Sequence, residues 1–379
     1  MTVNKNIVLV RQRFSAFGGA ERFLDQALES LRQQGAELSI VTRSWQGGQA
    51  TASGVVCNPF FIGRLWRDAG FVWQVCRLLS SWQGVLVQSH ERLPCCDIYR
   101  AGDGVHAVWL QQRARVVSPL QRLFDRYAPY HLYTRLMERR LYHSPRLKAV
   151  ICNSAMVKRE IQQMFGVAEE RLHVIYNGVD TARFHPSLRE QHRQAVRDQW
   201  HIPAEAMLFL FLGSGYQRKG LSQAMAALAQ QSQPSWLLVV GHDRKQQDYE
   251  RQALRLGLAD RVRFAGSQAD AAPFYGAADA FVLPSLYDPF ANAVLEAMAA
   301  GLPVMTSTSC GAVDLIVDGD NGYLLDALDE TALALAMTRL QQIELRRCMG
   351  ERARQTVLPL TFANMAERLL HLYNEVLSA

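Results

Sequence analysis

The sequence predicts an α/β protein in which two doubly wound parallel sheets, one in each of two domains, face a cleft. Three observations support this. Short apolar runs alternate with helix-forming runs along most of the chain, which is the pattern of consecutive βαβ units. A polar and irregular stretch at 181–203 interrupts the alternation and indicates a connection between domains. A length of 379 residues is enough for two domains that each bury a core.

These observations predict an N-terminal domain at 1–180 and a C-terminal domain at 181–360. The last helix, at about 361–377, has no strand after it. We therefore expect residues 361–379 to return to the first domain and to pack against it.

The N-terminal domain is expected to open with a βαβ unit. An apolar strand at 6–10 leads into a loop with Gly18 and Gly19, and a helix at about 20–34 follows. Adjacent glycines let a backbone approach a ligand closely and leave the first N–H groups of the helix available to it. G-x-G-x-x-G is absent, so a plain turn is the alternative. Further strands are expected at 38–41, 84–87, 97–100, 149–152 and 172–176.

The C-terminal domain repeats the alternation of strands and helices. Its strands at 207–212 and 280–283 are continuous apolar runs, as expected for buried strands of a parallel sheet. Further strands are expected at 236–240, 262–264 and 303–305, and helices at 221–231, 246–256, 270–277 and 292–300.

The C-terminal domain is organised around the stretch 284–304. Asp288 lies in the loop before the helix at 292–300, and Glu296 lies about one turn inside that helix. The free N–H groups of its first turn favour an anion, which indicates a site for a phosphorylated ligand. A lone Asp at this position is more often an N-cap, so the interpretation depends on its pairing with Glu296 and on cations upstream. The residues of that first turn are Asn292, Ala293, Val294 and Leu295.

Those cations are Arg218 and Lys219, in a glycine-containing loop at 213–220 that follows the first strand of the C-terminal domain. Two cations on the same sheet as Asp288 could neutralise a diphosphate from one side, while the helix N-terminus binds it from the other. The loop does not have the Walker order of residues. Two solvated cations are the alternative interpretation.

A second candidate site follows the strand at 97–100. Asp103 and His106 lie three residues apart in one loop, close enough to act on one substrate. A histidine can polarise a hydroxyl or bind a sugar, and an aspartate can orient a group or accept a proton. A histidine with a purely structural role is the alternative.

The stretch 109–148 is strongly basic. It holds nine Lys and Arg against two acids, and aromatic residues are interleaved with them. Cations beside interfacial aromatic residues suit an anionic membrane surface. Nucleic acid would also be attracted, but the stretch carries no nucleic-acid-binding motif and we expect no such partner. A solvated helical face is the plain alternative.

Composition excludes several other classes. The seven cysteines show no C-x-x-C pair and no histidine at metal-ligand spacing, so we expect reduced thiols, a cytosolic chain and no metal site. The N-terminus lacks the apolar region of a secretion signal, and no apolar run approaches the length of a transmembrane helix.

Taken together, these motifs resemble those of the retaining glycosyltransferases of family 4, which have the GT-B fold of two Rossmann-like domains. The resemblance covers nearly the whole chain and is most specific from Asn177 to Gly322. The matching segments are 17–22, 176–180, 218–220, 278–285, 295–304 and 320–322.

The resemblance implies roles for individual residues. Asp288 and Glu296 match the two acids of the E-x7-E motif, of which the first lies beside the donor sugar and the second holds the nucleotide ribose. Arg218 and Lys219 match the pair that binds the diphosphate. Gly18 and Gly19 match a loop that faces donor phosphate and acceptor, and Asp103 and His106 fall in the acceptor-side catalytic region. The first acid here is Asp rather than the commoner Glu.

The resemblance is greatest to the family members that build the lipopolysaccharide core. It implies transfer of a hexose, with glucose expected, from a UDP-sugar to a core heptose or a similar lipid-linked acceptor, without a metal or other cofactor. It further implies a peripheral protein on the inner face of the cytoplasmic membrane. A transferase for another glycolipid or capsule acceptor, and a non-catalytic sugar-nucleotide-binding protein, are the alternatives.

Overall fold

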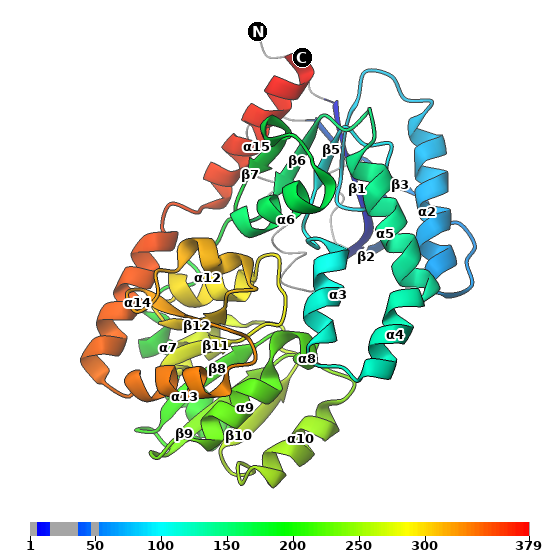
Figure 1. The fold of residues 1–379 in the computed structure, drawn as a ribbon. Helices are drawn as coiled ribbons and strands as arrows, with labels where there is room; N and C mark the ends of the chain where they lie inside the picture. Colours follow the sequence, from blue (N-terminus) through cyan, green and yellow to red (C-terminus); the bar gives the residue numbers. More distant parts are fainter. Residues whose placement is uncertain (1–5, 16–36, 47–52, 379) are drawn as a thin grey trace. The chain divides into compact units, whose positions relative to one another are not determined.

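The structure, a computed structural model, describes residues 6–15, 37–46 and 53–378, and the chain divides into two compact units (Figure 1). The first unit comprises Met1–Gly178 and Phe362–Ala379, and the second comprises Val179–Thr361. Each unit contains one parallel sheet covered by helices.

The sheet of the first unit has seven strands among the described residues, in the order β3-β2-β1-β4-β5-β6-β7. All neighbouring strands are parallel, and the order reverses next to β1, as in a doubly wound sheet. The strands are β1 (Asn6–Ser15), β2 (Glu37–Gln46), β3 (Ser53–Val56), β4 (Leu86–Ser89), β5 (Ile98–Arg100), β6 (Ala149–Cys152) and β7 (Leu172–Val174).

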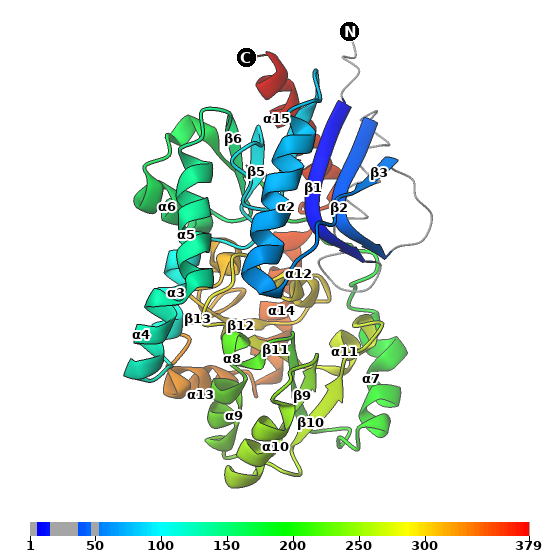
Figure 2. The ribbon, with the colours of Figure 1, turned by 90° about the vertical axis from the view of Figure 1, so that its right-hand side faces the viewer.

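Helices α2 and α15 cover opposite faces of this sheet (Figures 1 and 2). Alternate residues of a strand point to opposite faces, and Ile7 and Leu9 of β1 pack in one buried cluster with Leu369 and Tyr373 of α15. The Tyr373 hydroxyl also donates a 2.7 Å hydrogen bond to Oε1 of Gln88. The prediction that the last helix packs on the first domain is therefore confirmed. The helices among the described residues of this unit are α2 (Gly63–Leu79), α3 (His106–Ala114), α4 (Pro119–Tyr127), α5 (Pro129–Tyr142), α6 (Ala155–Phe165) and α15 (Phe362–Ser378).

The second unit has a six-stranded parallel sheet in the order β10-β9-β8-β11-β12-β13. Its central strands are buried on both faces, and this explains why they are continuous apolar runs. The strands are β8 (Met207–Leu212), β9 (Ser235–Val240), β10 (Val262–Gly266), β11 (Ala280–Leu283), β12 (Val304–Ser307) and β13 (Gly322–Leu325). The helices are α7 (Leu188–Gln199), α8 (Tyr216–Lys219), α9 (Leu221–Ala229), α10 (Gln246–Arg255), α11 (Ala272–Ala277), α12 (Asn292–Ala299), α13 (Glu330–Arg339) and α14 (Ile343–Val357).

The stretch 181–203 is not the irregular connection that its composition indicated. It contains α7, in which few apolar residues are buried and the fixing contacts are ionic. Arg189, Arg193 and Arg197 all form ion pairs with Asp279, which lies just before β11. Because these contacts bridge more than 80 residues of sequence, the apolar periodicity of the stretch itself does not reveal the helix.

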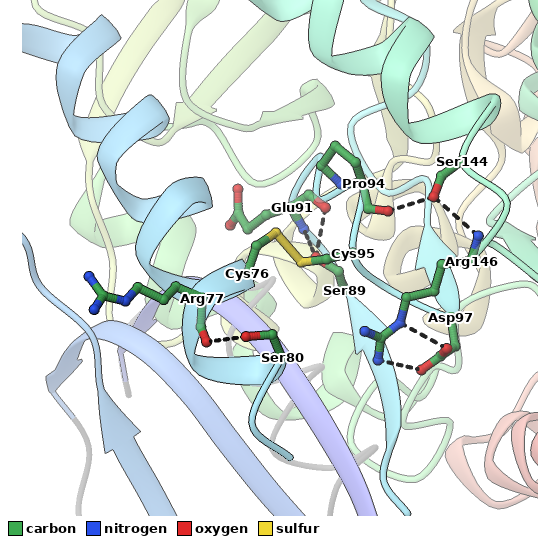
Figure 3. The surroundings of a disulfide bond; sticks show 10 residues. All are labelled: Cys76, Arg77, Ser80, Ser89, Glu91, Pro94, Cys95, Asp97, Ser144 and Arg146. Atoms are coloured by element: carbon green, nitrogen blue, oxygen red, sulfur yellow. Dashed lines mark hydrogen bonds and ion pairs between the residues drawn. A yellow bond between two sulfur atoms is a disulfide. The ribbon is translucent and has the colours of Figure 1, made fainter. Parts of the chain in front are cut away.

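Cys76 and Cys95 form a disulfide, so the expectation of reduced thiols is wrong for this pair (Figure 3). The bond joins the last turns of α2 to the loop after β4, with 5.7 Å between the two Cα atoms. Contacts next to it fix the same loop, since the Ser144 hydroxyl donates to the carbonyl of Pro94 at 2.6 Å. The pairing depends on tertiary proximity, which the spacing of 19 residues does not indicate.

Candidate active site

Arg218, Lys219 and Asp288 follow two strands that are neighbours in the sheet of the second unit. The two cations form the end of α8, which comes after β8, and Asp288 lies in the loop after β11. The chain winds outward from β8 to β10 and then continues at β11 on the other side of β8. In open α/β sheets, ligands bind outside the carboxyl ends of the strands at such a reversal.

The side chains of these three residues meet. The Lys219 ammonium donates a hydrogen bond to Oδ2 of Asp288, and Nη1 of Arg218 lies 3.4 Å from the same oxygen. Nη1 of Arg218 also donates to the carbonyl of Tyr287 at 3.2 Å. The two cations differ in exposure: the side chain of Arg218 is 37% exposed and that of Lys219 only 12%. Arg218 is therefore the cation with more surface available to a ligand.

Asp288 is buried but ionised. Burial alone would raise its pKa, but the charges of Lys219 and Arg218 outweigh burial and hold the pKa below its ordinary value. The backbone N–H of Phe290 adds a 3.2 Å hydrogen bond to Oδ1, which also favours the charged form. The carboxylate is thus fixed in orientation and negative at neutral pH.

Gly220 allows the loops after β8 and β11 to pack together. Its φ is +80°, and a Cβ at this position would lie 2.0 Å from the carbonyl oxygen of Pro284. Any larger residue would push the loop of Asp288 away from α8. The glycine is therefore a geometric requirement of the cation–carboxylate cluster.

Glu296 is held by a residue that the sequence did not single out. The hydroxyl of Tyr275, on α11, lies 2.7 Å from Oε2 of Glu296 and 3.3 Å from the carbonyl oxygen of Ala293. Burial, followed by the charge of Glu296, raises the pKa of Tyr275 well above its ordinary value, so the hydroxyl stays protonated and donates. Tyr275 thereby positions a carboxylate in α12.

The first turn of α12 is only partly exposed. Asn292 and Ala293 are half-buried, whereas the side chains of Val294 and Leu295 are fully buried and belong to the core. The N–H of Val294 already donates to the carbonyl of Ala291 at 3.0 Å. What Val294 and Leu295 could offer a ligand is thus limited to their backbone.

Asp103 and His106 of the first unit belong to one network centred on Arg92. Nη1 of Arg92 lies 3.3 Å from Oδ2 of Asp103, whose side chain is 71% exposed, and Nε donates to Oε1 of Glu138 at 3.0 Å. Oε1 of Glu138 also accepts the backbone N–H of His106 at 2.9 Å, at the start of α3. Asp103 therefore faces solvent, while His106 lies in the interior of the same network.

His106 is neutral. Burial is the largest cause and the charges of Arg92 and His131 add to it, so that the pKa of His106 falls from 6.5 to about 3. Its Nε2 lies 2.9 Å from Nδ1 of His131, so one ring donates the proton of this hydrogen bond and the other accepts it. A neutral imidazole can accept or donate a hydrogen bond but supplies no positive charge.

Glu138, like Arg92 and Tyr275, is a residue that the sequence analysis did not single out. It is almost fully buried, burial raises its pKa, and its Oε2 is buried without a hydrogen-bond partner among the described residues. A signal was present, because Glu138 shares a helical stripe with the other buried residues of α5. Those are Thr134, Met137, Leu141 and Tyr142.

Two further expectations from the sequence concern the glycine loop and the absence of a metal site. Gly18 and Gly19 are outside the residues that the structure describes. Within the described ranges, no group of three or more His, Cys, Asp or Glu side chains is arranged to hold a metal ion.

The basic stretch 109–148 forms α3, α4 and α5, and its exposed face is amphipathic. Leu120, Leu123, Phe124 and Tyr127 occur at helical spacing along α4, and each is more than half exposed. Arg122 and Arg126 are exposed beside them. Other members of the stretch are structural, since Tyr142 is buried. None of the helices in the described part of the chain is both long and apolar enough to cross a membrane.

The chain has two doubly wound parallel sheets in separate units, and one sheet carries a cation–carboxylate cluster where its strand order reverses. This is the architecture of the GT-B class of glycosyltransferases. Comparison with known families agrees. The model described as glycosyl transferases group 1 matches residues 192–356, and that of glycosyltransferase family 4 matches residues 17–183. Together the two matches span most of the chain, which therefore belongs to the glycosyltransferases described by these two models.

Individual relatives cover almost the full chain. The lipopolysaccharide glucosyltransferase WaaG of Escherichia coli is 25% identical over 90% of this chain and 91% of its own. The lipopolysaccharide core biosynthesis glycosyltransferase LpsE of Rhizobium meliloti is 27% identical over 91% of this chain and 92% of its own.

Solved structures share the fold. The crystal structure of WaaG matches with a TM-score of 0.81 at 24% identity, covering 97% of this chain and 99% of that one. The structure of Anabaena HepE in complex with UDP-glucose matches with a TM-score of 0.75 at 20% identity, covering 98% and 99%.

Proposed function

We propose that this glycosyltransferase moves a hexose, with glucose as the expected sugar, from a UDP-sugar to a lipopolysaccharide core heptose or a similar lipid-linked acceptor, with retention at the anomeric carbon. The observation that carries the proposal is the cluster of Arg218, Lys219 and Asp288 at the carboxyl ends of β8 and β11, with Glu296 in the helix that follows. WaaG is a lipopolysaccharide glucosyltransferase and HepE binds UDP-glucose, and these two proteins support the acceptor class and the donor.

The donor's diphosphate would lie against Arg218 and the N-terminus of α12. A guanidinium group and the N-terminus of a helix can stabilise the negative charge that develops as the bond from sugar to phosphate breaks. This would make a metal unnecessary. Glu296, held by Tyr275, would accept hydrogen bonds from the ribose, and Asp288 would face the hydroxyl groups of the sugar.

Retention follows if the acceptor attacks from the face that the diphosphate leaves. An oxocarbenium-like centre forms at the anomeric carbon, and a β-phosphate oxygen on that face takes the proton of the acceptor hydroxyl. The new glycosidic bond and UDP are the products. Neutral His106 and exposed Asp103 would bind acceptor or sugar hydroxyl groups, a role that needs no charge on the imidazole.

A membrane-bound acceptor requires the enzyme to reach a lipid surface. The apolar stripe of α4, which includes Leu120 and Phe124 and has arginines beside it, would enter the interface of an anionic membrane. We accordingly propose a peripheral location on the inner face of the cytoplasmic membrane.

The proposal is tested by incubating the purified chain with a panel of radiolabelled UDP- and other nucleotide sugars and with truncated lipopolysaccharide acceptors. Transfer of glucose from UDP-glucose to a heptose-terminated core, with an α-linkage in the product, is the expected result. Transfer to a capsule or other glycolipid instead would change only the acceptor. If UDP binds but the chain neither transfers sugar to any acceptor nor hydrolyses any UDP-sugar, the enzymatic proposal is contradicted.

A further inference from the structure

A cavity of about 410 Å³ lies in the second unit, at the edge of the sheet opposite to Asp288. Its wall includes Asp279 and Pro303, which directly precede β11 and β12, whereas Asp288 follows β11. Neighbouring strands here are parallel, so the amino ends of both strands lie at this edge. The residues that follow α12 and one face of α14 also contribute to the wall.

Cations outnumber acids around this cavity. Asp279 pairs with Arg189 at 3.1 Å, Arg193 at 2.9 Å and Arg197 at 2.7 Å, so one carboxylate serves three guanidinium groups. Arg189 lines the cavity, and its side chain is 48% exposed. The excess of positive charge is therefore not neutralised by Asp279.

A further cation, Arg346 of α14, faces the same cavity. Burial lowers its pKa most, and the positive charges of Arg189 and Arg193 lower it further although Asp279 opposes them. Its Nη1 donates to the carbonyl of Leu340 at 2.8 Å. A guanidinium group in this setting gains from an anion that approaches through the cavity.

The remaining wall is mainly apolar. Pro186, Leu302, Ile343 and Tyr275 line a volume within the usual range for small-molecule sites. The charged and polar members of this part of the wall are Arg347, Glu351, Arg354 and Gln355, all on α14. A bare phosphate ion would fill only part of it. Charge and shape together favour a ligand that carries a phosphate group on a larger, partly apolar body.

We propose that this cavity binds a phosphorylated small molecule, whose phosphate lies between Arg189 and Arg346 and whose body lies against Tyr275 and Leu302. The site is separate from the one formed by Arg218 and Asp288, because it opens at the other edge of the sheet.

The two sites share structural parts. Tyr275 lines the cavity and also donates the hydrogen bond that holds Glu296. Helix α12 carries Glu296 and ends at the cavity, where the guanidinium of Arg354 donates to the carbonyl of Ala299. A ligand that moves the ring of Tyr275 would thus change the position of Glu296. This coupling rests on the proposed function, and it requires that ligand and UDP alter each other's affinity by the same factor.

The cavity is tested by titration calorimetry of the full chain with glucose 6-phosphate and, separately, inorganic phosphate, both in the presence of saturating UDP. Arg189→Gln/Arg346→Gln is expected to weaken binding of glucose 6-phosphate by about tenfold or more. Arg352→Gln is the matched control, because Arg352 is on the same helix, pairs with Asp320 and is not part of the wall. Equal affinity of the double variant and the control for glucose 6-phosphate would overturn the proposed site. The site would also be overturned if neither glucose 6-phosphate nor inorganic phosphate bound to the unsubstituted chain.

Thermal melting will show whether Arg189→Gln/Arg346→Gln still folds. If it does not, a second pair of variants tests the site. Ile343 is 67% exposed at the cavity, and Leu335 is 59% exposed on α13 outside it. Ile343→Glu is expected to repel the phosphate and weaken binding, whereas Leu335→Glu leaves it unchanged. The same affinity in both would also overturn the site.

The coupling is tested with Tyr275→Phe, which keeps the cavity wall and removes the hydrogen bond to Glu296. Glucose 6-phosphate should still bind this variant, but it should no longer change the affinity for UDP. A shift in UDP affinity as large as that of the unsubstituted chain would overturn the coupling. If UDP does not bind the unsubstituted chain at all, the proposed transferase function fails, while binding of glucose 6-phosphate without UDP still decides the cavity.

Discussion

The ammonium group of Lys219 donates a hydrogen bond to the buried carboxylate of Asp288, which joins the end of α8 to the loop after β11. Arg218 is adjacent in sequence but contacts the same oxygen only at 3.4 Å and is three times as exposed. The two cations therefore have different tasks. Lys219 fixes the acid, and Arg218 is the one positioned to meet a diphosphate.

Arg218→Ala should lower turnover far more than it lowers stability. Loss of one preorganised donor at a developing charge typically costs about 10²–10³ in kcat. The side chain is partly exposed, so its ion pair with Asp288 contributes about 1 kcal/mol or less to folding. Steady-state kinetics with UDP-glucose and thermal melting measure the two effects. Arg251→Ala, at an exposed ion pair on α10, is the control, and unchanged turnover in Arg218→Ala would contradict its assigned role.

Lys219→Met should instead destabilise the fold. It leaves Asp288 buried without its main partner, and breaking such a pair from one side typically costs about 3–5 kcal/mol. Lys219→Met/Asp288→Asn removes both charges and should recover much of that loss while remaining inactive. Urea unfolding of the two single variants and the double variant gives the coupling energy. Strict additivity of the two changes would show that the pair makes no contribution of its own.

The sequence predicted best the bounds of those strands whose burial can be inferred from their own run of apolar residues. The strands at 149–152, 207–212 and 280–283 have the predicted bounds, because a parallel strand covered on both faces is a continuous apolar run. The cluster of Lys219 and Asp288 was also within reach, since both residues follow strands of one βα series and ligands gather where its order reverses.

The features that were missed depend on contacts between distant residues. Helix α7 is fixed by Asp279, and Cys76 pairs with Cys95 only because α2 ends beside the loop after β4. The hydrogen bond from Tyr275 to Glu296 joins α11 to α12, and the residue pattern of neither helix predicts it. Glu138 is different, since a helical count along α5 would have placed it on the buried stripe.

The fold should lose stability in mild acid through His106. At pH well above 6.5 the ring is neutral in both the folded and the unfolded state. As the pH falls toward the folded-state value of about 3, the unfolded chain binds a proton that the folded chain does not, which costs about 1.4 kcal/mol per pH unit for this group. Urea unfolding of the unsubstituted chain and of His106→Gln between pH 7 and 5 should show a shallower loss in the variant. His371→Gln, at an exposed position, is the control, and equal slopes in all three would contradict the burial of a neutral ring.

Binding to anionic vesicles should depend on the apolar stripe of α4 as well as on charge. Leu120 and Phe124 are 78% and 68% exposed, so replacing both with glutamate leaves the core intact while it removes apolar area and opposes the negative surface. We expect Leu120→Glu/Phe124→Glu to weaken sedimentation with phosphatidylglycerol vesicles by about tenfold or more, and higher salt to weaken binding of the unsubstituted chain. Leu254→Glu/Leu335→Glu introduces the same charges at exposed apolar positions on α10 and α13 and should bind nearly as well as the unsubstituted chain. Equal binding to neutral vesicles, or equal losses in both double variants, would show that α4 is not the contact surface.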